Sequence, residues 1–166
     1  MTPVKLRGLY AITDEHLIPE TAFAATIEQA LNGGTAIIQY RDKSGSETKR
    51  LEQASVLRSL CNEYRASLII NDDIALAKAV AADGVHLGED DVSIDQARLI
   101  LGNKAIIGVS CYNQLQLGTR AQTAGADYAA FGAVFTSPTK PHARSASCEL
   151  ISEAKSQLDI PVCAIG

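Results

Sequence analysis

A repeated unit of helix, glycine or aspartate turn, and short apolar strand constrains this fold more than any other feature. The unit is visible in the stretches ALNGGTAIIQYRD, AVAADGVHLGEDD and AQTAGADYAAFGAVF. Helices are expected to end at left-handed caps on Gly33 and Gly125, and a strand follows each turn within a few residues. Seven strands are predicted in this way, at residues 8–13, 35–42, 67–72, 84–88, 105–111, 128–135 and 161–165.

The segments between the strands carry apolar residues at helical spacing. Two such stripes are predicted to be buried: Phe23, Ile27, Ala30 and Leu31 in one helix, and Leu51, Ala54, Leu57, Cys61 and Tyr64 in another. The strands are nearly continuous apolar runs, as at residues 68–70 and 105–107, which is typical of parallel strands covered on both faces. Strict alternation of strands and helices therefore predicts an α/β fold with a parallel sheet.

The ends of the strands distinguish an open doubly wound sheet from a closed barrel. An open sheet gathers ligand groups at one switch point, whereas a barrel recruits them from the carboxyl ends of nearly all its strands. Almost every predicted strand here ends in polar residues, and no GxGxxG follows the first strand. The sequence predicts a TIM (β/α)8 barrel forming a single domain over residues 1–166, truncated after the seventh strand and lacking the last βα unit.

Composition and charge exclude several classes of partner. Of 166 residues, 46% are hydrophobic and 20% charged, as in ordinary soluble globular proteins. A net charge of -4 without a cluster of Lys and Arg argues against nucleic acid or an anionic membrane as partner. The N-terminal stretch MTPVKLRGLYAITD lacks the apolar core of a signal peptide, and no apolar run approaches membrane-spanning length. A cytoplasmic location is the expectation.

The stretch QYRDK, at the end of the second predicted strand, combines an amide with two cations. Gln39, Arg41 and Lys43 are spaced so that they share one face if strand geometry persists. A planar guanidinium beside a mobile ammonium suits a phosphate or pyrophosphate. A solvated loop with charges of both signs, including Asp42, is the alternative, and these residues alone do not decide between the two.

Carboxylates follow the next two strands in IINDD and HLGEDD. Adjacent parallel strands lie about 4.8 Å apart, so Asp72 and Asp91 can reach one ion, and hard oxygen ligands suit Mg²⁺. The alternative is helix capping, because carboxylates are favoured at helix N-termini. Capping accounts well for Asp73 and Asp90 and less well for Asp72 and Asp91.

The stretch FGAVFTSPTKPHA combines an apolar strand with a polar loop. Ser137 and Thr139 can donate hydrogen bonds to phosphate oxygens, and Lys140 adds a positive charge. An ordinary surface turn is the alternative. His86, inside GVHLG, is interpreted as a satisfied interior histidine rather than a catalytic base.

Six motifs, in this order and spacing, resemble the thiamine-phosphate synthase family along essentially the whole chain: QYRDK, IINDD, GVHLGEDD, IGVSCYN, GADYAAFGAVFTSPTK and IPVCAIG. The resemblance implies a transferase of thiamine biosynthesis that joins hydroxymethylpyrimidine pyrophosphate to hydroxyethylthiazole phosphate and releases pyrophosphate. It implies Mg²⁺ held by Asp72 and Asp91. The implied substrate-binding residues are Gln39, Tyr40, Arg41, Asp42, Lys43, Asn71, Ser110, Ser137, Thr139, Lys140 and Gly166, and of these Arg41, Lys43 and Lys140 stabilise the departing pyrophosphate.

The chain departs from the family pattern at three places. Ser137 replaces the first threonine of the usual Thr-x-Thr-Lys but keeps its hydroxyl. Tyr112 stands where the family often has histidine, which leaves that contact open. The chain stops at Gly166, where the family continues through a Gly-Gly-Ile turn and an eighth strand.

Two other functions are compatible with these motifs. One is a thiazole tautomerase, an isomerase that relies on a general base, but the joint presence of Arg41, Lys43, Asp72 and Asp91 favours the synthase. The other is a non-catalytic fragment that binds a phosphorylated ligand because its barrel cannot close. Open barrel edges would also favour self-association of the chain.

Overall fold

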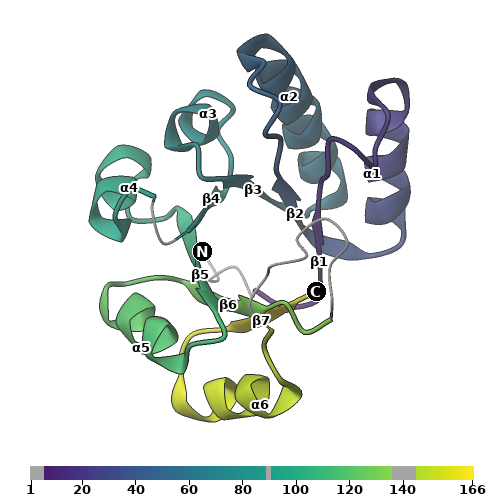
Figure 1. Cartoon of the computed structure of the whole chain (residues 1–166). Helices are drawn as coiled ribbons and strands as arrows, with labels where there is room; N and C mark the ends of the chain where they lie inside the picture. The colour runs from purple at the N-terminus through teal and green to yellow at the C-terminus, as the bar shows by residue number, and fades with distance from the viewer. Residues whose placement is uncertain (1–5, 89–90, 136–144) are drawn as a thin grey trace. The chain divides into compact units, whose positions relative to one another are not determined.

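The chain divides into two compact units. The computed structural model describes residues 6–88, 91–135 and 145–166. Of these residues, one unit comprises 6–86 and 97–105, and the other comprises 87–88, 91–96, 106–135 and 145–166. Figure 1 shows the recurring succession of strand and helix along the chain. The prediction of a single domain stays a prediction.

The first unit contains parallel strands that pair in chain order. Strand β1 pairs with β2, β2 with β3, and β3 with β4. Its elements are β1 (Leu9–Ile12), the short 3-10 helix η1 (Glu20–Ala22), α1 (Phe23–Asn32), β2 (Thr35–Tyr40), α2 (Glu47–Tyr64), β3 (Ser67–Asn71), α3 (Ile74–Ala79) and β4 (Gly84–Leu87), of which Leu87 is counted with the second unit. Helix α4 (Ile94–Leu101) has residues in both units.

Helix α2 illustrates how the sequence sets the elements of this unit. The Ser46 hydroxyl accepts a hydrogen bond from the Lys49 amide at 3.4 Å and caps the helix, and Arg65 ends it in the left-handed region. Ala54, Leu57 and Cys61 are buried as predicted, whereas Leu51, from the same predicted stripe, is 47% exposed. The buried face is therefore narrower than the sequence stripe.

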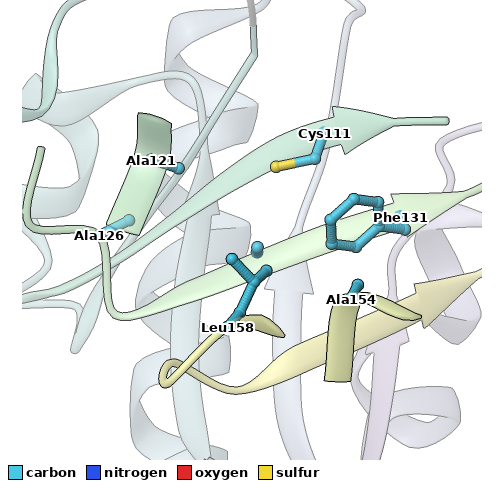
Figure 2. Close-up of a cluster of buried hydrophobic side chains, with 7 residues drawn as sticks. Cys111, Ala121, Ala126, Phe131, Ala154 and Leu158 are labelled. Atoms are coloured by element: carbon cyan, nitrogen blue, oxygen red, sulfur yellow. The ribbon is translucent and has the colours of Figure 1, made fainter. Parts of the chain in front are cut away.

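The second unit contains β5 (Ile106–Tyr112), α5 (Leu115–Thr123), β6 (Tyr128–Gly132), α6 (Cys148–Gln157) and β7 (Val162–Ile165). Strands β5, β6 and β7 are parallel and pair in that order. Figure 2 shows part of its core, where the Phe131 ring lies among Cys111, Ala154 and Leu158. A Cβ atom on Gly118 of α5 would lie 2.8 Å from Phe131 and 2.9 Å from Leu158, so only glycine lets the helix approach this closely.

The same aspartate arrangement fixes a strand start in each unit. In the first, Asp83 donates its amide to the Leu68 carbonyl at 2.9 Å, and its carboxylate accepts the Leu68 amide at 2.7 Å. In the second, Asp127 makes the same two contacts with Ile107, both at 2.7 Å. Each aspartate thereby satisfies the backbone amide and carbonyl of the second residue of the neighbouring strand.

All seven predicted strands are present, with small differences at their ends. The left-handed cap at Gly125 is confirmed, with φ of 87°. The cap expected at Gly33 is wrong, because Gly33 keeps right-handed geometry, with φ of -72°, and Gly34 takes the positive φ of 92°. The Gly33 amide still bonds to the Gln29 carbonyl at 3.0 Å, so the helical turn continues through it and the chain reverses one residue later.

No helix in the described part of the chain combines the length and apolar character that crossing a membrane requires.

Candidate functional site

The residues at the end of β2 alternate between two environments. Tyr40 and Asp42 face the helices. The Tyr40 ring meets that of Phe23 edge-on, with centroids 6.2 Å apart, and its hydroxyl donates to Gln53 Oε1 at 3.0 Å. Burial accordingly raises the pKa of Tyr40. Both ends of this side chain are therefore engaged within the fold.

Asp42 is held in the same way. One carboxylate oxygen accepts the Ser44 amide at 2.7 Å, and the other lies 3.0 Å from Lys49 Nζ. Burial acts to raise the pKa of Asp42, but the hydrogen bonds from Ser44 and Lys49 outweigh it and lower the pKa. With its side chain 2% exposed, Asp42 is directed toward α2. Direct substrate contact by Tyr40 and Asp42 stays a prediction, and their contacts with Gln53, Ser44 and Lys49 favour a role in shaping the loop.

The alternate residues, Gln39 and Arg41, meet polar groups of β1 and the segment after it. Gln39 is buried, and its Nε2 donates to the Tyr10 hydroxyl at 2.8 Å. The Thr13 hydroxyl accepts the Arg41 amide at 2.8 Å and donates to the Arg41 carbonyl at 3.0 Å. A single side chain thus fixes the backbone from which the Arg41 guanidinium extends.

Glu15 is a further member of this region that the sequence analysis missed. Its Oε1 accepts the Lys43 amide at 3.2 Å, and its Oε2 lies 4.0 Å from Arg41 Nη1. The Glu15 side chain is only 9% exposed. It follows Thr13 and Asp14 at a polar strand end, so the rule that selected the other strand ends would also have selected it.

The end of β3 brings together three residues that the sequence singled out. Asp72 Oδ2 accepts hydrogen bonds from Lys43 Nζ at 2.5 Å and from Asn71 Nδ2 at 2.6 Å. Two neighbouring strand ends, β2 and β3, therefore supply a cation, a carboxylate and an amide at one place. The Lys43 side chain is 53% exposed, so its ammonium remains accessible to a ligand.

The two adjacent aspartates after β3 have different tasks. Asp73 Oδ1 accepts the Leu76 amide at 2.9 Å and caps α3, which confirms the capping interpretation, and Asp73 also pairs with Arg50. Asp72 instead takes a left-handed backbone, with φ of 63°, and donates its amide to the His86 carbonyl at 2.9 Å. From that backbone turn the Asp72 carboxylate meets Lys43, whereas the Asp73 carboxylate caps the helix. His86 is buried, as predicted.

In the second unit, Asp91 folds back onto the end of the preceding strand. Its Oδ2 accepts the Gly88 amide at 2.5 Å. A cavity of about 380 Å³ adjoins it, and Ser110 of β5 lines that cavity. Tyr112, at the end of the same strand, takes a left-handed backbone with φ of 52°. The remaining lining residues are Leu87, Gly88, Val92, Ser93, Ile94, Val109, Leu117, Arg120, Ala121 and Ala124.

Of the remaining predicted residues, the structure describes Gly166 but not the four that lie between its described segments. Gly166 has φ of 128°, and a Cβ atom there would lie 2.5 Å from the Val134 amide nitrogen, so both backbone and space require glycine. Ser137, Thr139 and Lys140 lie outside the described residues, as does Asp90.

The predicted metal ligands lie in different units, Asp72 in the first and Asp91 in the second. Among the described residues, no group of three or more His, Cys, Asp or Glu is arranged to hold a metal ion. Both predicted ligands offer hard carboxylate oxygens, a donor chemistry that fits Mg²⁺.

The family model and the curated relatives point to the same family. A family model described as thiamine monophosphate synthase matches residues 9–166. Thiamine-phosphate synthase of Nitrosococcus oceani is 53% identical over 161 residues, which cover 97% of this chain and 74% of that protein. The enzyme of Thioalkalivibrio sulfidiphilus is 50% identical over 165 residues, covering 99% and 78% of the two chains.

A solved structure extends the similarity to three dimensions. Thiamine phosphate pyrophosphorylase from Pyrococcus furiosus matches with a TM-score of 0.84 and 39% identity, covering 95% of this chain and 74% of that one. The predicted α/β fold of the TIM-barrel class is thereby confirmed. The chain spans about three quarters of the length of these relatives.

Proposed function

The chain belongs to the thiamine-phosphate synthase family, and from that premise we propose which of its residues bind the metal, bind the substrates and stabilise the leaving group. Its function is that of a thiamine-phosphate synthase, a transferase of thiamine biosynthesis. The proposed substrates are hydroxymethylpyrimidine pyrophosphate and hydroxyethylthiazole phosphate, and the products are thiamine phosphate and pyrophosphate. A cytoplasmic location is part of the proposal.

The contact among Lys43, Asp72 and Asn71 carries this proposal. An ammonium and a carboxylate share one place at the ends of β2 and β3, with a side-chain amide beside them. Such a group can receive an anion together with a divalent cation, because the ammonium complements phosphate and the carboxylate complements the metal. A pyrophosphate bound together with Mg²⁺ needs both a cation for its phosphate oxygens and a carboxylate for the metal.

We assign the metal to Asp72 and Asp91, whose carboxylates have the oxygen chemistry that Mg²⁺ prefers. When bound, Mg²⁺ would neutralise charge on the pyrophosphate oxygens. The left-handed backbone at Asp72 supports this role, because its carboxylate meets the Lys43 ammonium while the Asp73 carboxylate caps the helix.

The other residues bind and orient the two substrates in this proposal. The bond between the pyrimidine methylene carbon and the pyrophosphate oxygen breaks, and the aminopyrimidine ring delocalises the resulting positive charge while the thiazole nitrogen bonds to that carbon. Arg41, Lys43 and Lys140 stabilise the departing anion through preorganised charge. Gln39, Asn71 and Ser110 hold the pyrimidine substrate, and Ser137, Thr139 and Gly166 hold the thiazole phosphate.

The Lys43→Ala variant tests the assignment directly. Thiamine phosphate formation would be measured with both substrates and saturating Mg²⁺. The turnover number is expected to fall by about 10²- to 10³-fold, because one preorganised charge is lost from the developing anion. Lys78→Ala, at an exposed lysine of α3, is the matched control and should retain the unaltered rate. Turnover by Lys43→Ala close to that of the control would remove Lys43 from the site.

Self-association through exposed strand edges is a separate proposal. Leu9 and Ile12 of β1 are 62% and 39% exposed, which leaves apolar surface that a second copy could cover. Sedimentation velocity at increasing protein concentration tests it, and a constant monomer mass would contradict it.

A further inference from the structure

Gly88, directly after β4, has its side-chain space occupied by the Asp91 carboxylate. Its amide donates to Asp91 Oδ2 at 2.5 Å. A Cβ atom on Gly88 would lie 2.9 Å from that same oxygen, closer than real Cβ atoms approach other atoms, and 3.8 Å from the Tyr112 hydroxyl. The carboxylate can keep this position only while residue 88 has no side chain.

We propose that Gly88 is a positioning residue for Asp91 and, through Asp91, sets the affinity of the protein for Mg²⁺. The inference rests on the proposed function, in which Asp91 is a metal ligand. A carboxylate has about four acceptor sites, so the bond from Gly88 fixes the orientation of the group without exhausting its capacity to bind a metal. Outer groups that orient metal ligands in this way commonly control metal affinity.

The requirement for glycine at this position comes from space and not from backbone geometry. Gly88 is not among the glycines with positive φ, so alanine can adopt its backbone conformation. The atom that alanine would displace is the end of a flexible side chain. Substitution is therefore expected to move the Asp91 carboxylate while leaving the fold in place.

Gly108 shows what a glycine required by core packing looks like in the same unit. A Cβ atom there would lie 1.8 Å from the ring of Tyr128, which is itself buried. That ring has no solvent into which to move, whereas the obstacle at Gly88 is a carboxylate. The comparison separates a glycine that serves packing from one that serves the site.

Gly88→Ala tests the inference by direct metal binding. Isothermal titration of the whole chain with Mg²⁺, in the presence of inorganic pyrophosphate, should give a dissociation constant about 10- to 100-fold above that of the unaltered protein. The turnover number should recover when Mg²⁺ is raised to saturation. Gly33→Ala is the matched control, because Gly33 also has negative φ and lies far along the chain at the end of α1.

A double variant asks whether Gly88 acts through Asp91. If it does, Gly88→Ala combined with Asp91→Asn binds Mg²⁺ no more weakly than Asp91→Asn alone. Effects on the binding free energy that simply add would overturn the inference. So would a lowered melting temperature of Gly88→Ala with unchanged Mg²⁺ affinity, because the glycine would then serve the fold.

Measurements on the single variants distinguish the positioning role of Gly88 from the metal role of Asp91. If Asp91→Asn weakens Mg²⁺ binding and Gly88→Ala does not, the positioning role is wrong and the metal role of Asp91 stands. If Asp91→Asn leaves Mg²⁺ binding unchanged, the metal role of Asp91 fails and the inference about Gly88 fails with it.

Discussion

Thr13 shows how one hydroxyl can fix the backbone of Arg41, which is proposed to stabilise the departing pyrophosphate. It is buried, and it satisfies both the amide and the carbonyl of Arg41. Valine has nearly the same shape but neither donates nor accepts a hydrogen bond, so Thr13→Val leaves both backbone groups of Arg41 without this partner. The guanidinium would then extend from a less constrained strand end.

Thr13→Val is expected to lower the free energy of unfolding by about 1 to 3 kcal/mol, the usual cost of unsatisfied buried polar groups. The KM for the pyrimidine pyrophosphate should rise in the same variant. Urea unfolding and steady-state kinetics measure the two effects. Thr13→Ser keeps the hydroxyl and should restore most of the affinity, and a Thr13→Ser variant as impaired as Thr13→Val would show that the methyl group matters instead.

At the scale of residues, the sequence predicted which residues after β2 and β3 lie together better than it predicted the contacts that support them. Lys43, Asn71 and Asp72 were selected because they follow adjacent apolar strands, and the structure joins them on one carboxylate oxygen. The roles of Thr13 and Glu15 depend on how loops bend after β1, which strand periodicity does not determine. The different contacts of Asp72 and Asp73 likewise depend on the left-handed backbone of Asp72.

At the scale of elements, Gly118 sets the distance between α5 and the core of the second unit. At an exposed helical position, replacing glycine by alanine would stabilise the helix by about 1 kcal/mol, because alanine has the higher helix propensity. At Gly118 its Cβ atom would collide with the Phe131 ring and with Leu158, and overpacking of this kind costs about 1 to 3 kcal/mol. The collision involves two buried side chains, Phe131 of β6 and Leu158 directly after α6, so neither can move freely.

We therefore expect Gly118→Ala to destabilise the protein by up to about 2 kcal/mol, because the cost of overpacking exceeds the gain in helix propensity. The midpoint of urea unfolding measures the change. Gln116→Ala, at an exposed position of the same helix, should leave the midpoint unchanged or raise it slightly. A stabilised Gly118→Ala protein would show that α5 can shift outward at no cost.

The elements themselves were predictable because apolar runs and turn residues agree along the chain. Strands such as β3 are too apolar to be loops and too short to be helices, and all seven were placed correctly. The cap of α1 was misplaced because Gly33 and Gly34 offer the same freedom to the backbone. The difference between them lies in the hydrogen bond of Gly33 to Gln29, which the sequence does not reveal.

At the scale of the whole molecule, the reactivity of the cysteine thiols can be used to follow the unfolding of each unit separately. Burial raises the pKa of Cys61 to about 11, of Cys111 to about 12 and of Cys163 to about 11. Cys148 is exposed. Since the thiolate is the reactive form, a thiol with a pKa near 11 has only about one thiolate in a thousand at pH 8. Cys148 should therefore react first in the native protein.

A Cys148→Ser protein allows the buried thiols to be followed during unfolding. Cys61 belongs to the first unit and Cys111 to the second. If the chain is one domain, as the sequence predicts, both thiols should become reactive at the same urea concentration, measured by alkylation at pH 8 and mass spectrometry of the peptides. Two distinct midpoints would identify two domains.

The aspartate arrangement shared by Asp83 and Asp127 has a consequence for the history of the chain. Each residue fixes the start of a strand within its own unit, through contacts of the same kind to Leu68 and to Ile107. A segment that carries its own means of anchoring can be duplicated, lost or exchanged without redesign of the junction. Ancestral growth by segment duplication, and recombination of segments in the laboratory, would both leave this anchoring intact.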